Sequence, residues 1–176
     1  MRPLDKKTTR RVTRMALLTA IALTIFMAEA QIPNPIPIPG IKLGLANIVT
    51  MVALYMFKPR HALLILVPRC CFAAAFGGGA TGFWFSICGG LLALGVMVLA
   101  KMASVFSVYG VSILGAAAHN IGQILAAMVL MNSVYIGAYL PYLLIVAIVT
   151  GLVTGSICAG VLRILPKVLE VRHEKS

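Results

Sequence analysis

The 176-residue chain has very little acid, with four Asp and Glu residues against 15 Lys and Arg. Charged residues make up only 11% of the sequence, whereas a soluble domain carries about 25%. Such a chain cannot cover a folded surface with hydrated groups, and this excludes a soluble enzyme. The net charge of +11 does not indicate nucleic-acid binding either, because the basic residues are not gathered on one polar face.

The shortage of acids also removes most catalytic chemistry. Asp5 is the only aspartate, so the chain can build neither a Ser–His–Asp triad nor an Asp-rich motif that holds Mg²⁺ on a diphosphate. The glycine-rich segment 77–82 lacks the Lys-Ser/Thr pair of a phosphate-binding loop. The three histidines, of which His61 and His173 lie outside the apolar runs, provide no set of metal ligands. We therefore expect no enzyme activity, no cofactor and no metal.

Long hydrophobic runs fill nearly everything between Met15 and Leu165, and 61% of the chain is hydrophobic. A membrane-spanning helix needs about 20 mostly apolar residues, so the chain has room for roughly six. Interruptions by proline, glycine and basic residues place the spans at residues 15–30, 41–57, 62–76, 82–100, 111–131 and 139–165. Pro68 makes the third span the least secure helix. The predicted fold is an all-α integral membrane protein with a six-helix bundle.

The distribution of basic residues predicts the orientation, because cytoplasmic loops retain Lys and Arg. All but Lys42 and Arg69 fall on one side if six spans leave both termini in the cytoplasm. An alternative is a cleaved signal peptide ending at the Ala-Glu-Ala triplet of residues 28–30. Cleavage would leave five spans and put the basic second loop on the wrong side. The expected organisation is a basic N-terminal segment, a membrane domain and a basic tail, at residues 1–14, 15–165 and 166–176.

Arg69 is the most informative polar residue, because a charge at membrane depth is costly to hold there. It lies midway along the third span, too far from either end for its side chain to reach water easily. Glu29 is the only acid outside the two tails. Either Glu29 pairs with Lys42 at the outer rim and leaves Arg69 to a ligand, or it reaches Arg69 in a structural pair. The sequence favours a ligand role for Arg69 and leaves both pairings open.

The fifth span contains a second polar group. His119 and Gln123 are four residues apart and share a helix face, with Asn120 beside them, and Asn47 of the second span could join them. Three polar side chains in one span indicate a cavity inside the bundle, although a membrane histidine is equally often a hydrogen-bonding link between helices. The predicted substrate-binding residues are Arg69, Asn47, His119, Asn120 and Gln123.

Two further features each have a functional and a structural interpretation. The prolines of segment 32–40 enforce a stiff, extended strap, which is either a wall or lid of an outward-facing pocket or only a rigid connector. Ala16, Ala20, Thr24 and Ala28 recur every four residues and give the first span a small-residue face. That face packs either against a partner helix or inside the bundle.

Four segments together resemble the Gx transporter family, which is also called heptaprenyl diphosphate synthase component I. They are PGIKLGLANIVT at 39–50, the third span around Arg69 with its three-glycine end, GVSILGAAAHNIGQ at 110–123 and TGLVTG at 150–155. This family is similar to the six-helix, substrate-binding S components of energy-coupling factor (ECF) transporters. The resemblance extends from the first span to the sixth.

The resemblance implies a multi-pass protein of the bacterial cytoplasmic membrane that takes up a small, vitamin-like solute or metabolite through an outward-facing pocket. Two ATPase subunits and a T-type transmembrane subunit would supply the energy. The small-residue face at Ala16 and Ala20, continued by Thr24, would contact the T-type subunit. One alternative is a non-catalytic membrane subunit associated with prenyl diphosphate or quinone metabolism, and another is a stand-alone scaffold or flippase-like protein.

Overall fold

The computed structural model describes residues 6–29, 31, 44–75 and 79–174, and within these ranges it contains helices and turns but no strand. This confirms the predicted all-α class. The elements, in chain order, are α1 (Lys6–Glu29), α2 (Asn47–Met56), α3 (Pro59–Ala73), α4 (Gly79–Met102), α5 (Val108–Leu130), the 3₁₀-helix η2 (Val134–Tyr139) and α6 (Leu140–Glu174).

In the part of the chain that the structure describes, four helical segments are long and apolar enough to cross a membrane: Thr8–Glu29, Gly79–Met102, Val108–Leu130 and Val134–Ile164. The chain is therefore a multi-pass membrane protein. The helices α2 and α3 have only 10 and 15 residues, fewer than the roughly 20 that a full span needs. The predicted second span begins at residue 41, and residues 41–43 lie outside the described part of the chain, as does the whole proline strap. Six complete spans thus stay a prediction.

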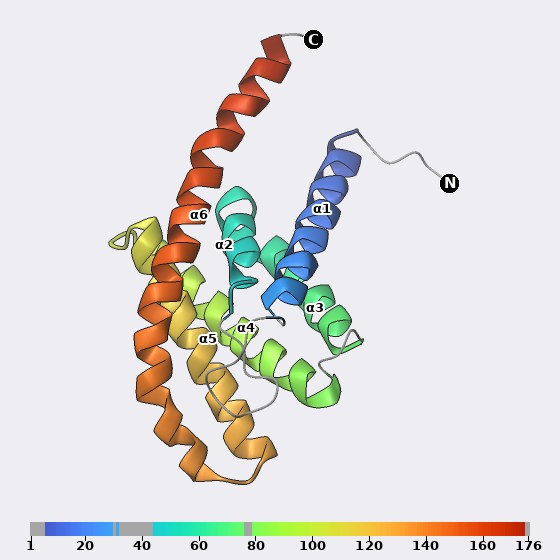
Figure 1. Ribbon diagram of the computed structural model, residues 1–176. Coiled ribbons are helices and arrows are strands. Elements are labelled where there is room, and N and C mark those ends of the chain that lie inside the picture. The colour runs from blue at the N-terminus through green and yellow to red at the C-terminus, as the bar shows by residue number, and fades with distance from the viewer. Residues whose placement is uncertain (1–5, 30, 32–43, 76–78, 175–176) are drawn as a thin grey trace.

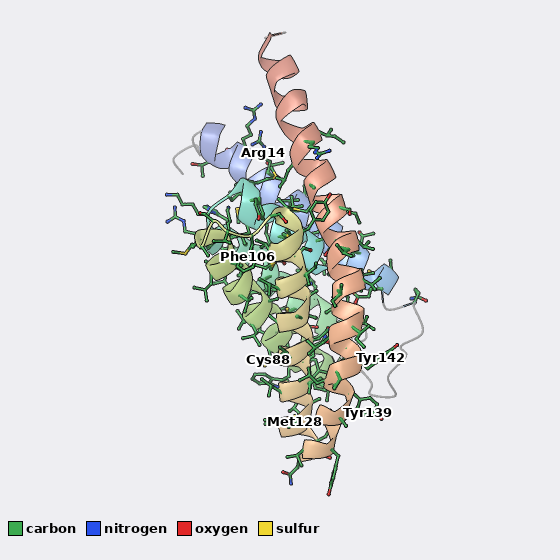
Figure 2. The ribbon with its side chains drawn as sticks, turned by 90° about the vertical axis from the view of Figure 1, so that its left-hand side faces the viewer. Arg14, Cys88, Phe106, Met128, Tyr139 and Tyr142 are labelled. Carbon is green, nitrogen blue, oxygen red and sulfur yellow. The ribbon has the colours of Figure 1, made fainter. Side chains whose placement is uncertain are left out.

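The start of α1 and the end of α6 lie at the same end of the bundle, and η2 lies at the opposite end (Figure 1). In Figure 2, Arg14 and Phe106 lie toward the end that carries the termini, and Met128 and Tyr139 lie toward the other. This arrangement agrees with an even number of crossings, and the compartment that each end faces stays a prediction.

Glycines set how closely the central helices approach. A Cβ atom built on Gly122 of α5 would lie 2.8 Å from the Cys88 carbonyl oxygen and 2.8 Å from Gly89 Cα of α4. A Cβ atom on Gly151 of α6 would lie 2.6 Å from Ile113 Cα of α5. Small residues allow such backbone contact, which drives helix association in lipid through packing. The helices α4, α5 and α6 therefore form the tightly packed half of the molecule.

Several element boundaries differ from the predicted ones. Pro68 lies inside α3 without ending it, because the turn around a proline can be re-satisfied by neighbours in a membrane helix. The predicted fourth span begins at residue 82, but α4 already begins at Gly79, inside the predicted outer loop at 77–81. The segment 132–137, predicted as an outer loop between the fifth and sixth spans, contains most of η2. The helices α1 and α6 also continue into the basic N-terminal segment and the basic tail.

Candidate solute-binding site

The middle of helix α5 carries three polar side chains into the interior. His119, Asn120 and Gln123 are 3%, 1% and 1% exposed, because α4 packs on one side of α5 and α6 on the other. The three residues lie at the depth where Gly122 brings the α4 backbone into contact. No bulk water reaches them there, so each polar atom needs a partner inside the bundle.

The His119 ring is held between two backbone segments. A Cβ atom on Gly44, in the turn before α2, would lie 2.7 Å from His119 Cδ2. A Cβ atom on Gly89 of α4 would lie 2.9 Å from His119 Nδ1 and 2.9 Å from Gln123 Cγ. Gly44 also has a φ of +81°, a conformation that favours glycine. The side chains of His119 and Gln123 therefore occupy the space that a Cβ atom on Gly44 or Gly89 would need.

Asn47 lies beside this ring. The Cβ position of Gly44 that meets His119 is also 3.2 Å from Asn47 Nδ2. Asn47 is buried, and neither its Oδ1 nor its Nδ2 has a hydrogen-bond partner. Thr50 Oγ1, one turn further along α2, and His119 Nδ1 are likewise buried without a partner. The first turns of α2 thus bring several unsatisfied polar atoms to α5.

Arg69 reaches the same region from α3. It is 3% exposed, and its Nη2 lies 3.4 Å from the Cβ position of Gly90, the neighbour of Gly89 on α4. Its Nη2 contacts Cys70 Sγ at 4.0 Å, and its Nε has no partner. The guanidinium of Arg69 and the imidazole of His119 therefore lie against adjacent residues of α4, Gly90 and Gly89.

Asn120 is turned toward α6. Its Nδ2 donates a hydrogen bond to the Leu143 carbonyl oxygen at 2.8 Å, whereas its Oδ1 has no partner. This bond links α5 to α6. A hydrogen-bonding link between helices is one of the two predicted roles of this polar group. The structure therefore brings Asn47, Arg69, His119 and Gln123 together and places Asn120 at the edge of their cluster.

Glu29 has a role that the sequence did not indicate. Its carboxylate accepts a hydrogen bond from the Gly44 backbone N–H at 2.6 Å, and its side chain is 5% exposed. Lys42, one of its two predicted partners, lies outside the described residues, and the described residues contain no ion pair between Glu29 and Arg69. The acid thus ties the end of α1 to the turn that covers His119.

A small cavity adjoins the cluster between α2, α5 and α6. It has a volume of about 10 Å³, close to what a single water molecule needs. Asn47 and the hydrogen-bonded pair of Ser112 and Thr154, whose hydroxyl oxygens are 2.5 Å apart, contribute to its wall. Sequence reasoning missed this pair, because an isolated Ser or Thr in an apolar helix commonly bonds its own backbone, as Thr150 does to Val146.

The predicted partner face lies away from the cluster, on the outside of α1. Ala16, Ala20 and Thr24 are all exposed, and the Thr24 hydroxyl donates to the Ala20 carbonyl oxygen at 3.1 Å. The described part of the bundle leaves this face uncovered. Its contact with a partner subunit stays a prediction.

A polar cluster enclosed by apolar helices defines the class: a multi-pass membrane protein with a candidate site for a small solute. The family model for heptaprenyl diphosphate synthase component I matches residues 18–161, most of the chain, and the chain belongs to this family. The predicted family is thus confirmed. No curated protein and no solved structure matches the chain. The similarity to S components of ECF transporters stays a prediction.

Proposed function

We propose that this protein is the solute-binding membrane subunit of an ECF-type transporter and that its polar cluster binds the solute. The observation that carries the proposal is the set of buried polar atoms without partners in Asn47, Thr50, Arg69, His119 and Asn120. A buried unsatisfied donor or acceptor costs about 1–3 kcal/mol. A purely structural cluster would pair its atoms, as Ser112 and Thr154 do.

A bound solute would supply the missing hydrogen bonds. These unsatisfied atoms come from three helices, α2, α3 and α5, and Arg69 Nη2 also lies close to Gly90 of α4. The described cavity beside the cluster, of about 10 Å³, is too small for an organic molecule, so a solute would need more room there. A movement of α2 and the Gly44 turn away from α5 would supply that room.

The energy for transport would come from partner subunits. The chain has no phosphate-binding loop of its own. The exposed small-residue face of α1, which includes Ala16, Ala20 and Thr24, offers a flat surface against which a helix of a coupling subunit could pack closely.

The experiment is mass spectrometry of the proteins and small molecules that co-purify from native membranes in mild detergent. We expect two ATPases, a coupling subunit and a bound metabolite. The variant Ala20→Leu should lose the ATPases and keep the metabolite. The control Ser156→Leu, at another exposed position, on α6, should keep both. Recovery of the protein with no ATPase would contradict the proposal.

A second candidate is a non-catalytic membrane subunit of a prenyl diphosphate synthase. The family description favours it, and so does an open apolar groove of about 780 Å³ between α4 and α5, lined by residues that include Trp84, Leu91, Leu125 and Val129. Such a groove suits an isoprenoid chain. Under this alternative, the same experiment recovers a soluble prenyl synthase in place of the ATPases.

A further inference from the structure

Arg69 is a buried cation that lacks an anionic partner in the described part of the chain. Its side chain is 3% exposed. Its one hydrogen bond there is the long contact from Nη2 to Cys70 Sγ at 4.0 Å, and its Nε has none. A thiol is ordinarily neutral and cannot balance the guanidinium. Charges inside membrane bundles are almost always paired, so the absence of a partner points to a ligand.

The acids of the chain are accounted for elsewhere. Only four exist, and Asp5, Glu170 and Glu174 lie in the two terminal regions. Glu29, the remaining one, accepts a hydrogen bond from the Gly44 backbone N–H at 2.6 Å. Among the side chains that the structure describes, no carboxylate therefore pairs with Arg69.

We propose that Arg69 binds a single carboxylate group of the solute. The proposal rests on the proposed solute-binding function and names the chemical class of the solute. Nε and Nη2 lie on one edge of the guanidinium plane, and such an edge binds the two oxygens of a carboxylate in a bidentate pair. One edge atom is unpartnered and the other has only the sulfur contact. The neutral remainder of the solute then faces Asn47 and His119.

The charge balance selects a carboxylate over a diphosphate. One guanidinium compensates one negative charge. The side chain in contact with it is the Cys70 thiol, and the polar side chains at the neighbouring glycines Gly44 and Gly89 are the neutral amides and imidazole of Asn47, Gln123 and His119. A diphosphate carries several charges and is usually held by Mg²⁺ on acidic side chains or by several cations. The described cluster has neither, so a prenyl diphosphate head group does not fit at Arg69.

The first test measures whether Arg69 lacks a counter-charge, without knowledge of the solute. Cys70→Asp and Cys70→Asn place side chains of equal size beside the guanidinium, and only one is charged. In the full chain in lipid nanodiscs, we expect C70D to melt above C70N when Arg69 is present and below it in an Arg69→Gln background. A C70D protein that melts below C70N in both backgrounds overturns the proposal. The comparison cancels the shared cost of the larger side chain.

The second test uses anionic probes and does not depend on the Cys70 variants folding. Butyrate and butyramide, benzoate and benzamide, and inorganic pyrophosphate are compared at equal high concentration by thermal melting. We expect the carboxylates to raise the melting temperature of the wild type by a few degrees, more weakly that of Arg69→Lys, and not that of Arg69→Gln. Equal protection by the amides, stronger protection by pyrophosphate, or no protection by any carboxylate overturns the proposal.

The two proposals fail separately. A neutral metabolite that co-purifies with the protein and its ATPases, and is lost in an Asn47→Ala variant, overturns the carboxylate assignment and leaves solute binding standing. Recovery of no ATPase and no metabolite contradicts the transporter proposal itself, whatever the probes show.

Discussion

Two buried asparagines, Asn47 and Asn120, differ in the hydrogen bonds that their side-chain amides make. Asn120 donates to the Leu143 carbonyl oxygen across the interface of α5 and α6. Asn47 makes no hydrogen bond with either side-chain atom. An amide that is already hydrogen-bonded stabilises the fold. A buried amide without a partner destabilises the fold, and it forms its hydrogen bonds only when a ligand binds. Substitution should therefore separate stability from binding.

We expect Asn120→Ala to lower the free energy of unfolding by about 1–2 kcal/mol, because the bond to Leu143 is lost. We expect Asn47→Ala to leave it nearly unchanged and to weaken solute binding about tenfold, which corresponds to roughly 1.4 kcal/mol. Thermal melting with and without the co-purified metabolite measures both quantities. A large loss of stability in Asn47→Ala would show that its amide is structural.

At the scale of helices, the crossing of α4 and α5 depends on backbone contact. We expect Gly122→Ala to cost about 1–3 kcal/mol, because the new methyl group would meet the Cys88 carbonyl oxygen and Gly89 Cα at 2.8 Å. Gly95→Ala on α4 is the matched control, since nothing lies within 4 Å of its Cβ position. The control should gain up to about 1 kcal/mol from helix propensity. Equal changes in melting temperature for Gly122→Ala and Gly95→Ala would contradict the close contact between α4 and α5.

The end of α1 is linked to the turn before α2 by one hydrogen bond, between Glu29 and Gly44. We expect Glu29→Ala to lower the free energy of unfolding by about 1.5–3 kcal/mol, because the carboxylate bonds the Gly44 N–H at 2.6 Å. Hydrogen exchange at the Gly44 amide should accelerate in this variant. Glu29→Gln keeps an acceptor oxygen and should accelerate it less. Unchanged exchange in Glu29→Ala would refute the link.

Hydrophobic runs predicted the helices and the depth of the polar residues, which is why Arg69 and His119 were identified as buried. The runs do not specify how each helix is rotated about its axis. Packing at Gly122 and Gly151 fixes that rotation, and it turns Asn120 toward α6 while His119 faces α4. The bond from Gly44 to Glu29 joins residues fifteen positions apart, and no periodic pattern encodes such a contact.

The arrangement of the whole molecule predicts its topology in the membrane. Val105, between α4 and α5, and Tyr135, in η2, are 83% and 86% exposed and lie near opposite ends of the bundle. A single cysteine at each position, in a variant that lacks the four native cysteines, shows which end of the bundle is accessible from outside the cell. With cytoplasmic termini, a membrane-impermeant thiol reagent applied to intact cells should label Tyr135→Cys and not Val105→Cys. The reverse pattern would invert the assigned orientation.

The shortness of α2 has a consequence for how far a solute has to travel. Ten residues make a helix about 15 Å long, roughly half of the 30 Å hydrocarbon layer. Asn47 stands at one end of α2, and the exposed Lys58 and Arg60 follow its other end. If the proposed solute binds beside Asn47, only about half of the hydrocarbon layer would separate it from the far side, which would roughly halve the distance that its carboxylate has to cross without water.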